Sequence, residues 1–422
     1  MDAAIEKKRN PASWVPTLYF AEGLPFVAIA TVTVIMYKDM GLSDAKIAFF
    51  TTLISWPWTL KPLWSPLLEM FKTKKYFVIA TQFIGGILFG LVALTLPLSS
   101  FFRYSIALFG IIAFNFATHD IAADGVYINV LNQNEQSKFV GWQGAFYNVA
   151  KFISQGALVY AAGQLEMALG VIHAWMIVMG IFGGIMVVLS LYHSKILPTG
   201  GAANQVKSVK EAFSTFGDVV KTFFEKKNIW WGIAFIILFR FAEGQAIKIV
   251  PLFLKSSRDI GGLGLSTSDI GIAYGIFGSA AFVLGSVLAG YFTSRRGLKK
   301  SLFTLACFFN IPFAVYAFLA ITMPTSFVII TIAIVFEYFG YGFGFVGIIL
   351  FMMQQIAPGK YKMAHYAFAT AVMYFGFMIP SMLSGYISDW LGYKDFFIWV
   401  MFATIPSFLV TWFVPFREVE GD

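Results

Sequence analysis

Long apolar stretches separated by short polar segments run along most of the chain. A helix needs about 20 mostly apolar residues to cross the hydrocarbon core of a bilayer. Twelve stretches meet this length, and they cover residues 14–37, 46–68, 76–97, 102–126, 138–163, 170–194, 229–254, 267–293, 301–322, 325–357, 361–387 and 395–416. The pattern therefore predicts an all-α integral membrane protein with twelve transmembrane helices.

Several stretches are longer than a straight span requires, so tilted or kinked helices are expected. Prolines within them are candidate kink points: Pro25, Pro57, Pro62, Pro251, Pro312 and Pro380. The fourth, fifth and seventh stretches carry charges and fit the apolar pattern least well. Lysine and arginine set the orientation, because with both termini in the cytoplasm the cytoplasmic side holds 20 of them and the other side holds 6.

One longer polar segment, 195–228, divides the twelve stretches into two sets of six. Apolar residues recur at near-helical spacing between positions 206 and 224, which predicts a basic amphipathic helix at the cytoplasmic face. We therefore expect an N-terminal half at 1–194, a cytoplasmic loop with this helix at 195–228, and a C-terminal half at 229–422.

The two halves share a short repeat. Phe20-Ala-Glu-Gly23 lies in the first stretch and Phe241-Ala-Glu-Gly244 lies in the seventh, which is the first of the second half. Duplicated six-helix halves are typical of major facilitator transporters. The loop Gly290-Tyr-Phe-Thr-Ser-Arg-Arg-Gly-Leu-Lys-Lys300 also resembles a loop motif of that superfamily, with Ser294 and Leu298 in place of its usual Asp and a basic residue. The sequence thus predicts the major facilitator fold.

The composition of the chain excludes several classes of protein. Hydrophobic residues make up 58% of the chain and charged residues 12%, whereas soluble domains average roughly 45–50% and ~25%. A soluble enzyme, a disordered chain and a nucleic-acid module are excluded, and the net charge of +8 lies mostly in loops. One cysteine and four scattered histidines predict no disulfide and no metal site, and we expect no cofactor. The chain has no phosphate-binding loop motif and no compact nucleophile set, so neither an ATP-driven pump nor an enzyme is expected.

Apart from charges in the first three residues of a span, nine charged residues lie inside the predicted spans. A charge at the bilayer centre costs at least ~2.5–3.5 kcal/mol. The nine residues are Glu22, Lys61, Asp120, Asp124, Lys151, Arg240, Glu243, Lys248 and Glu337. Each is therefore paired, faces water or has a function. Buried ion pairs between helices remain an alternative for all of them.

The five acids are the candidates for proton coupling: Glu22, Asp120, Asp124, Glu243 and Glu337. All fall on the first and fourth helices of the halves, which line the central cavity in major facilitator folds. Asp120 and Asp124 are four residues apart and share a helix face, where two ionised carboxylates repel and one is expected to hold a proton. The alternative is that one of them pairs with a lysine or arginine and only locks a conformation.

The candidates for substrate binding are Lys61, Trp64, His119, Gln143, Tyr147, Lys151, Arg240 and Lys248. Gln143, Tyr147 and Lys151 form a polar stripe on the fifth span, which suits a hydrophilic solute or hydrogen bonds between helices. Arg240 either binds an anionic group of the solute or forms an ion pair with Glu243, three residues further along the chain. Lys248 faces either the cavity or a neighbouring helix. His119 either titrates near neutrality or is a hydrogen-bonded packing residue. The proline-rich stretch around Lys61 and Trp64 is either a kink needed for packing or part of the pore wall.

Three segments together resemble the peptide–acetyl-coenzyme A transporter branch of the major facilitators, which includes muropeptide permeases. They are Glu22-Gly-Leu-Pro25, Lys61-Pro-Leu-Trp-Ser-Pro-Leu67 and Ala117-Thr-His-Asp-Ile-Ala-Ala-Asp-Gly125. The last matches the branch's acidic pair with Asp120 and Asp124, and departs from it at His119, where the branch has Gln. The chain also lacks room for the two extra helices of some muropeptide permeases.

The resemblance implies a proton-driven importer in the bacterial inner membrane, and we expect the protein to be a monomer. Its solute would be N-acetylglucosaminyl-1,6-anhydro-N-acetylmuramyl peptide or the corresponding disaccharide. A host-glycan disaccharide or a siderophore would suit the same scaffold, and exchange or uniport are alternatives to symport. A membrane scaffold or sensor without flux would carry a large soluble segment, and the loop 195–228 is too short for one.

Overall fold

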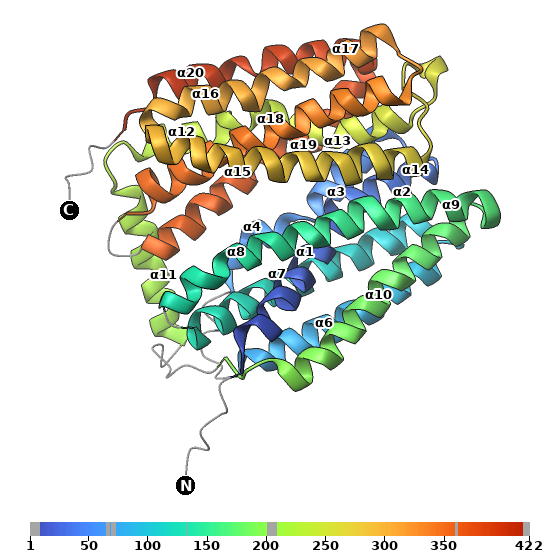
Figure 1. Ribbon diagram of the computed structural model, residues 1–422. Coiled ribbons are helices and arrows are strands. Elements are labelled where there is room, and N and C mark those ends of the chain that lie inside the picture. The colour runs from blue at the N-terminus through green and yellow to red at the C-terminus, as the bar shows by residue number, and fades with distance from the viewer. Residues whose placement is uncertain are drawn as a thin grey trace.

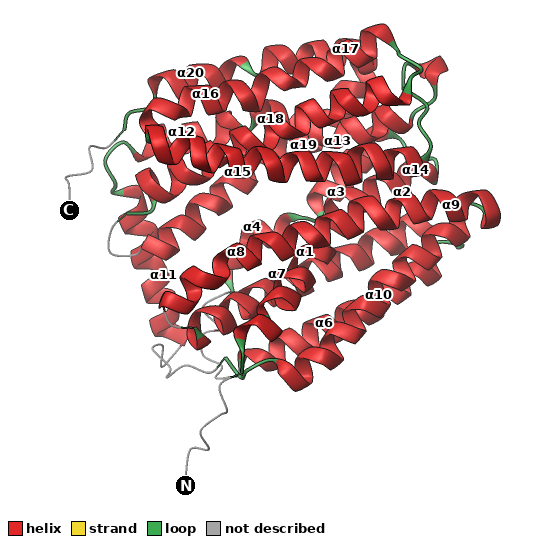
Figure 2. Ribbon diagram, in the orientation of Figure 1, coloured by secondary structure: helices red, strands yellow, loops and turns green. Residues whose placement is uncertain are grey.

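The computed structural model describes residues 9–64, 68, 73–131, 133–200, 209–358 and 362–416, and all regular secondary structure within these ranges is helical. The helices run roughly along one direction in a single bundle (Figures 1 and 2). Eight helical stretches in the described ranges are long and apolar enough to cross a membrane. Parts of the expected loop 195–228 and of the segment Lys61–Leu67 lie outside the described residues.

Two groups of helices lie side by side in Figure 1, one from the first part of the chain and one from the last. The first, here the N-terminal group, contains α1 (Val15–Val27), η2 (Ala28–Val32), α2 (Thr33–Asp39), α3 (Asp44–Leu53), α4 (Trp56–Leu60), η3 (Lys61–Leu63), α6 (Lys74–Thr95), α7 (Phe101–Val130), α8 (Gln133–Lys151), η4 (Phe152–Leu158), α9 (Val159–Leu169) and α10 (Val171–Ile196).

The second, here the C-terminal group, contains α12 (Ile229–Phe239), α13 (Phe241–Lys255), α14 (Thr267–Ile270), η6 (Gly271–Phe277), α15 (Gly278–Arg296), α16 (Leu298–Asn310), η7 (Ile311–Phe313), α17 (Ala314–Thr322), α18 (Phe327–Phe351), η8 (Met352–Ile356), α19 (Lys362–Ala403) and α20 (Ile405–Phe413). Between the groups lies α11 (Val209–Phe224), whose Phe223 is buried 4.7 Å from Phe368 of α19, ring centroid to ring centroid.

The long predicted spans are interrupted helices. The first breaks from α1 into the π-helical η2 just after Pro25, and the seventh is broken between α12 and α13 at Arg240. Helix α19 has 42 residues, about 60 Å of helix and twice the thickness of a bilayer core. Gly392, with φ 73° and ψ 161°, breaks α19 into two helices. Helix α19 therefore supplies the eleventh span and the start of the twelfth.

Residues 9–14 and 414–416 lie at the same end of the bundle, called the terminal end (Figure 1). The opposite end, called the far end, holds the turns at Gly41, Gly170 and Gly261. The two groups pack against each other toward the far end, where α9 contacts α14, η4 contacts η6, and α3 contacts α13 and α19.

Glycines allow the two groups to approach closely at this contact. A Cβ atom added at Gly275 would lie 2.2 Å from the backbone oxygen of Gln155, and one at Gly271 would lie 2.6 Å from the backbone nitrogen of Tyr160. The same holds in the other direction, because a Cβ at Gly163 would lie 2.4 Å from the backbone nitrogen of Ser268. Small residues permit such crossings between membrane helices.

Candidate functional site

The acidic pair of α7 is divided between two environments. Asp120 is only 3% exposed, and its Oδ2 accepts a hydrogen bond from Trp58 Nε1 at 2.8 Å and lies 3.4 Å from Lys61 Nζ. Asp124 is exposed and accepts a hydrogen bond from Tyr19 OH at 3.0 Å. The i, i+4 spacing brings the two residues to one region, but one is paired and the other is accessible.

Glu22 completes this N-terminal cluster. It is half-buried on α1, and Glu22, Asp120 and Asp124 all lie close enough to Lys61 to interact with it electrostatically. The cluster, defined as Glu22, Lys61, Asp120 and Asp124, therefore holds three carboxyls and one lysine. Ionised carboxyls in excess of their cation repel one another, which favours the uptake of a proton by the cluster.

A second cluster lies in the C-terminal group around the break between α12 and α13. Arg240 binds Glu243 through two hydrogen bonds, from Nε to Oε2 at 2.5 Å and from Nη2 to Oε1 at 2.6 Å. Tyr341 OH donates to Glu243 Oε1 at 2.8 Å, and the Arg240 guanidinium lies 4.4 Å from the ring centroid of Phe377. Arg240 and Glu243 thus form an ion pair along the helix, which was one of the two alternatives for Arg240.

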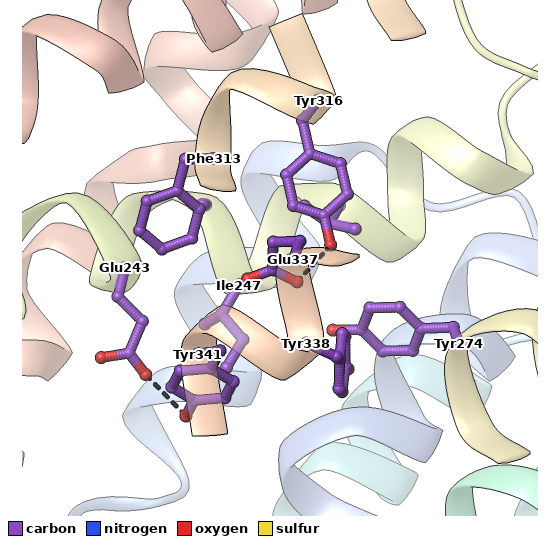
Figure 3. A pocket seen from close by; sticks show the side chains of 10 residues that line it. Glu243, Ile247, Tyr274, Phe313, Tyr316, Glu337, Tyr338 and Tyr341 are labelled. Carbon is purple, nitrogen blue, oxygen red and sulfur yellow. Dashed lines mark hydrogen bonds between the residues drawn. The ribbon is translucent and has the colours of Figure 1, made fainter. Parts of the chain in front are cut away.

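Glu337 lies beside this cluster, in a small pocket within the C-terminal group (Figure 3). Tyr316 OH donates to Glu337 Oε2 at 2.7 Å. The pocket is rich in aromatic rings, and its wall includes Glu243, Ile247, Tyr274, Phe313, Tyr316, Glu337, Tyr338 and Tyr341. Two carboxyls and four phenols thus surround one small space.

Aromatic rings lie between the two clusters. Phe26 of α1 lies 5.2 Å from Trp58, 6.4 Å from Tyr147 and 6.4 Å from Tyr374, measured between ring centroids. Tyr374 is close enough to interact electrostatically with both Lys61 and Arg240. Tyr147, a substrate-binding candidate, therefore lies where the two groups of helices face each other.

The remaining basic candidates also contact the opposite group. Lys151 Nζ lies 4.7 Å from the ring centroid of Phe282, and Lys248 Nζ donates to the backbone oxygen of Ala30 at 2.8 Å. Lys248 therefore faces a neighbouring helix, in the π-helical segment η2, and is buried.

The other candidates contribute less to this region. The ring centroid of Trp64 lies 4.8 Å from that of Phe114, and Gln143 is half-buried near the middle of α8. His119 is fully buried and accepts a hydrogen bond from the Gln82 side chain at 2.9 Å.

Several residues that complete the clusters are absent from the sequence-based candidates, namely Tyr19, Gln82, Trp58, Tyr341 and Tyr374. Aromatic residues make up 18% of the chain, so a single tyrosine or tryptophan gives no signal of its own. Tyr19 is the exception, because it lies three residues before Glu22 and so on the same helix face.

A polar cluster closes the far end between the two groups. Asp39 of α2 and Glu166 of α9 face Lys255 of α13 and Thr267 of α14. Lys255 Nζ lies 2.6 Å from Asp39 Oδ1 and 3.9 Å from Glu166 Oε2, and it also donates to Thr267 Oγ1. Glu166 lies beyond the expected fifth span, and burial together with the neighbouring Asp39 raises the pKa of its carboxyl to about 7.

Comparison with known proteins agrees with this architecture. An uncharacterized protein of Haemophilus influenzae is 23% identical over 415 residues, covering 94% of this chain and 93% of that protein. Anhydromuropeptide permease of Escherichia coli K12 is 22% identical over 401 residues, covering 93% of this chain and 77% of the permease. The crystal structure of the nucleoside transporter NupG superposes with a TM-score of 0.71 at 14% identity, covering 96% of this chain and 99% of NupG.

The fold and the two facing clusters define a multi-pass membrane transporter of small molecules, not an enzyme. The sequence profile of the Major Facilitator Superfamily matches residues 17–373. The chain belongs to the major facilitator superfamily, as the repeat and the loop motif predicted.

Proposed function

We propose that this chain imports an amino-sugar disaccharide or muropeptide together with protons by alternating access. The observation that carries the proton coupling is the N-terminal cluster, where three carboxyls share one lysine and Asp124 stays exposed. The similarity to anhydromuropeptide permease over 93% of the chain supports the class of solute. The protein would work as a monomer in the bacterial inner membrane, with both termini in the cytoplasm.

The mechanism follows from the contacts between the two groups. The far end is closed by Lys255 with Asp39 and by the glycine crossing, while Asp124 lies near the terminal end of α7 and is exposed. We therefore assign the structure to the inward-facing state. Rocking of the halves 1–194 and 229–422 about the central site, connected by 195–228, would open the far end.

In this cycle the N-terminal cluster takes up a proton from outside and Asp124 releases it inside. The solute would bind between the clusters. Lys61, Trp64, Tyr147 and Lys151 would face it from the N-terminal group, and Arg240 and Lys248 from the C-terminal group. The anionic groups of a muropeptide suit the basic residues, and the sugar rings suit the aromatic faces around Phe26. Glu243 and Glu337 form a second acidic pair that a proton would reach through the pocket of Figure 3.

Uptake of labelled anhydro-muropeptide disaccharide into right-side-out vesicles tests this function. An inward proton gradient is expected to drive accumulation, and Asp124→Asn is expected to abolish gradient-driven accumulation. Asp218→Asn is the matched control, because Asp218 is exposed on α11. An Asp124→Asn protein that still accumulates solute against its gradient would refute the role of Asp124. If folded protein takes up none of the disaccharide, this solute is wrong, and a host-glycan disaccharide or a siderophore takes its place.

A further inference from the structure

A row of buried polar side chains runs through the N-terminal group behind Asp120. Gln82 of α6, His119 of α7 and His193 of α10 are each 0% exposed. Gln82 Nε2 lies 2.9 Å from His119 Nε2, and Gln82 Oε1 lies 2.9 Å from His193 Nδ1. His193 Nε2 in turn lies 3.0 Å from Thr17 Oγ1 of α1. Burying a polar side chain costs free energy unless that side chain is hydrogen-bonded. A continuous row of such side chains across three membrane helices therefore indicates a role beyond packing.

The chemistry of the amide determines the proton positions in this row. An amide nitrogen only donates and an amide oxygen only accepts. Gln82 therefore donates to His119 Nε2, which leaves the proton of the neutral His119 on Nδ1. In the same way His193 donates from Nδ1 to Gln82, and His193 Nε2 accepts from the Thr17 hydroxyl.

The end of the row points at the candidate proton carrier. His119 Nδ1 lies 3.8 Å from Asp120 Oδ1, and both atoms are buried without a hydrogen-bond partner. The other oxygen of Asp120 is already bonded to Trp58 and close to Lys61. If the Gln82 amide were reversed, its oxygen would accept a proton from His119 Nε2, and His119 Nδ1 would carry none. The lone pair of Nδ1 would then face a lone pair of the Asp120 carboxylate, and the two would repel. The charge of Asp120 thus favours the amide orientation observed.

We propose that Gln82 and His193 are positioning residues for transport, which fix His119 in the tautomer whose Nδ1–H faces the free oxygen of Asp120. This inference rests on the proposed function. When the N-terminal cluster gives up its proton through Asp124 and Asp120 carries its full charge, a small approach of His119 gives the Asp120 carboxylate a charge-assisted hydrogen bond. His119 itself gives up no proton in this step. The other ionisable groups near Asp120 are Lys61, Asp124, Glu22, Tyr147 and Tyr374.

The tautomer can be measured without transport. In protein labelled with ¹⁵N-histidine, the His119 signal is expected to show a protonated Nδ1 and a bare Nε2, and Gln82→Met is expected to convert it to a mixture of tautomers. His173→Gln removes the signal of an exposed histidine and is expected to leave the His119 signal unchanged. A wild-type His119 with its proton on Nε2, or a His119 signal that Gln82→Met does not change, overturns the proposal.

The transport readout is the internal pH at which proton-driven disaccharide uptake is half-maximal. Gln82→Met is expected to raise it by about one pH unit, the effect of losing one hydrogen bond to a charged group. His193→Leu, which removes only the outer bond, is expected to move it less in the same direction, and it serves as the second variant should Gln82→Met fail to fold.

A double variant separates positioning from general damage. In a His119→Gln background no tautomer remains to be fixed, so adding Gln82→Met is expected to cause no further shift. A shift of full size in that background, or an unchanged midpoint in Gln82→Met alone, overturns the positioning role. If wild-type vesicles take up no disaccharide, the proposed solute is wrong, and the tautomer measurement still decides the assignment of Gln82.

Discussion

Lys255 and Asp39 join the two groups of helices at the far end, with Lys255 Nζ 2.6 Å from Asp39 Oδ1. Asp39 is almost fully buried, with 1% of its side chain exposed. Removing one partner of such a pair leaves a buried charge without compensation, which is costly. The pair therefore stabilises the closed far end and has to break when that end opens.

Lys255→Met is expected to shift the population toward an open far end by a factor of about ten or more, since loss of one buried partner costs about 2 kcal/mol or more. The measurement is the distance between spin labels at Met167 and Ile260, two exposed far-end positions on opposite groups, in a Cys307→Ser background. Lys394→Met is the control, because Lys394 is exposed at the same end. An unchanged distance distribution in Lys255→Met would show that the pair has no part in closure.

The closed far end is expected to depend on pH through Glu166. Burial beside Asp39 raises the pKa of Glu166 to about 7 in this state, above its ordinary value of 4.5. Opening exposes the carboxyl, so the closed state binds this proton more tightly. The stabilisation is therefore fully present below about pH 4.5 and is lost as the pH rises through about 7.

The same spin-label pair measures this effect, and the open fraction is expected to grow between pH 5 and about pH 7.5, a window set by the raised pKa. Lys255, Thr267, Asp39 and Trp175 form the polar surroundings of this site. Glu166→Gln is expected to remove most of the pH dependence while leaving the far end closed. A growth of the open fraction on acidification would contradict the sign.

The glycine crossing between η4 and η6 is expected to tolerate no side chain. Gly275→Ala places a methyl group against the backbone oxygen of Gln155, and overpacking of this kind costs typically about 1–3 kcal/mol. The variant is expected to favour the open far end and to slow transport. Gly184→Ala is the matched control, because a Cβ at Gly184 of α10 meets nothing within 4 Å. Equal transport rates in the two variants would argue against a tight crossing.

The Arg240–Glu243 pair is expected to show compensation between its two partners. Arg240→Met leaves Glu243 buried with Tyr341 as a hydrogen-bond donor, and loss of one partner of a buried pair costs about 3–5 kcal/mol. The double variant Arg240→Met with Glu243→Met is expected to be less destabilised than either single variant, because it buries no lone charge. Thermal unfolding in detergent measures this, with Arg103→Lys at an exposed position as the control. A double variant less stable than both single ones would exclude the compensation.

The sequence alone determined the architecture of this protein. Twelve apolar stretches, the Phe-Ala-Glu-Gly repeat and the loop motif predicted the major facilitator fold. Each stretch had to be helical, because backbone polar groups inside the lipid must form hydrogen bonds within their own segment. The sequence also located the charges of the site, since a charge within an apolar span is conspicuous.

Only the tertiary structure decided what those charges do. The sequence left two alternatives for Arg240, and the structure pairs it with Glu243, three residues on. Whether Lys248 contacts Ala30, and how Asp120 and Asp124 divide between burial and exposure, depend on neighbours that are far away in sequence. The row from Thr17 through His193 and Gln82 to His119 joins four helices and has no local signature. Hydropathy specifies which segments enter the membrane, whereas the partners of each buried polar group follow from how the helices pack.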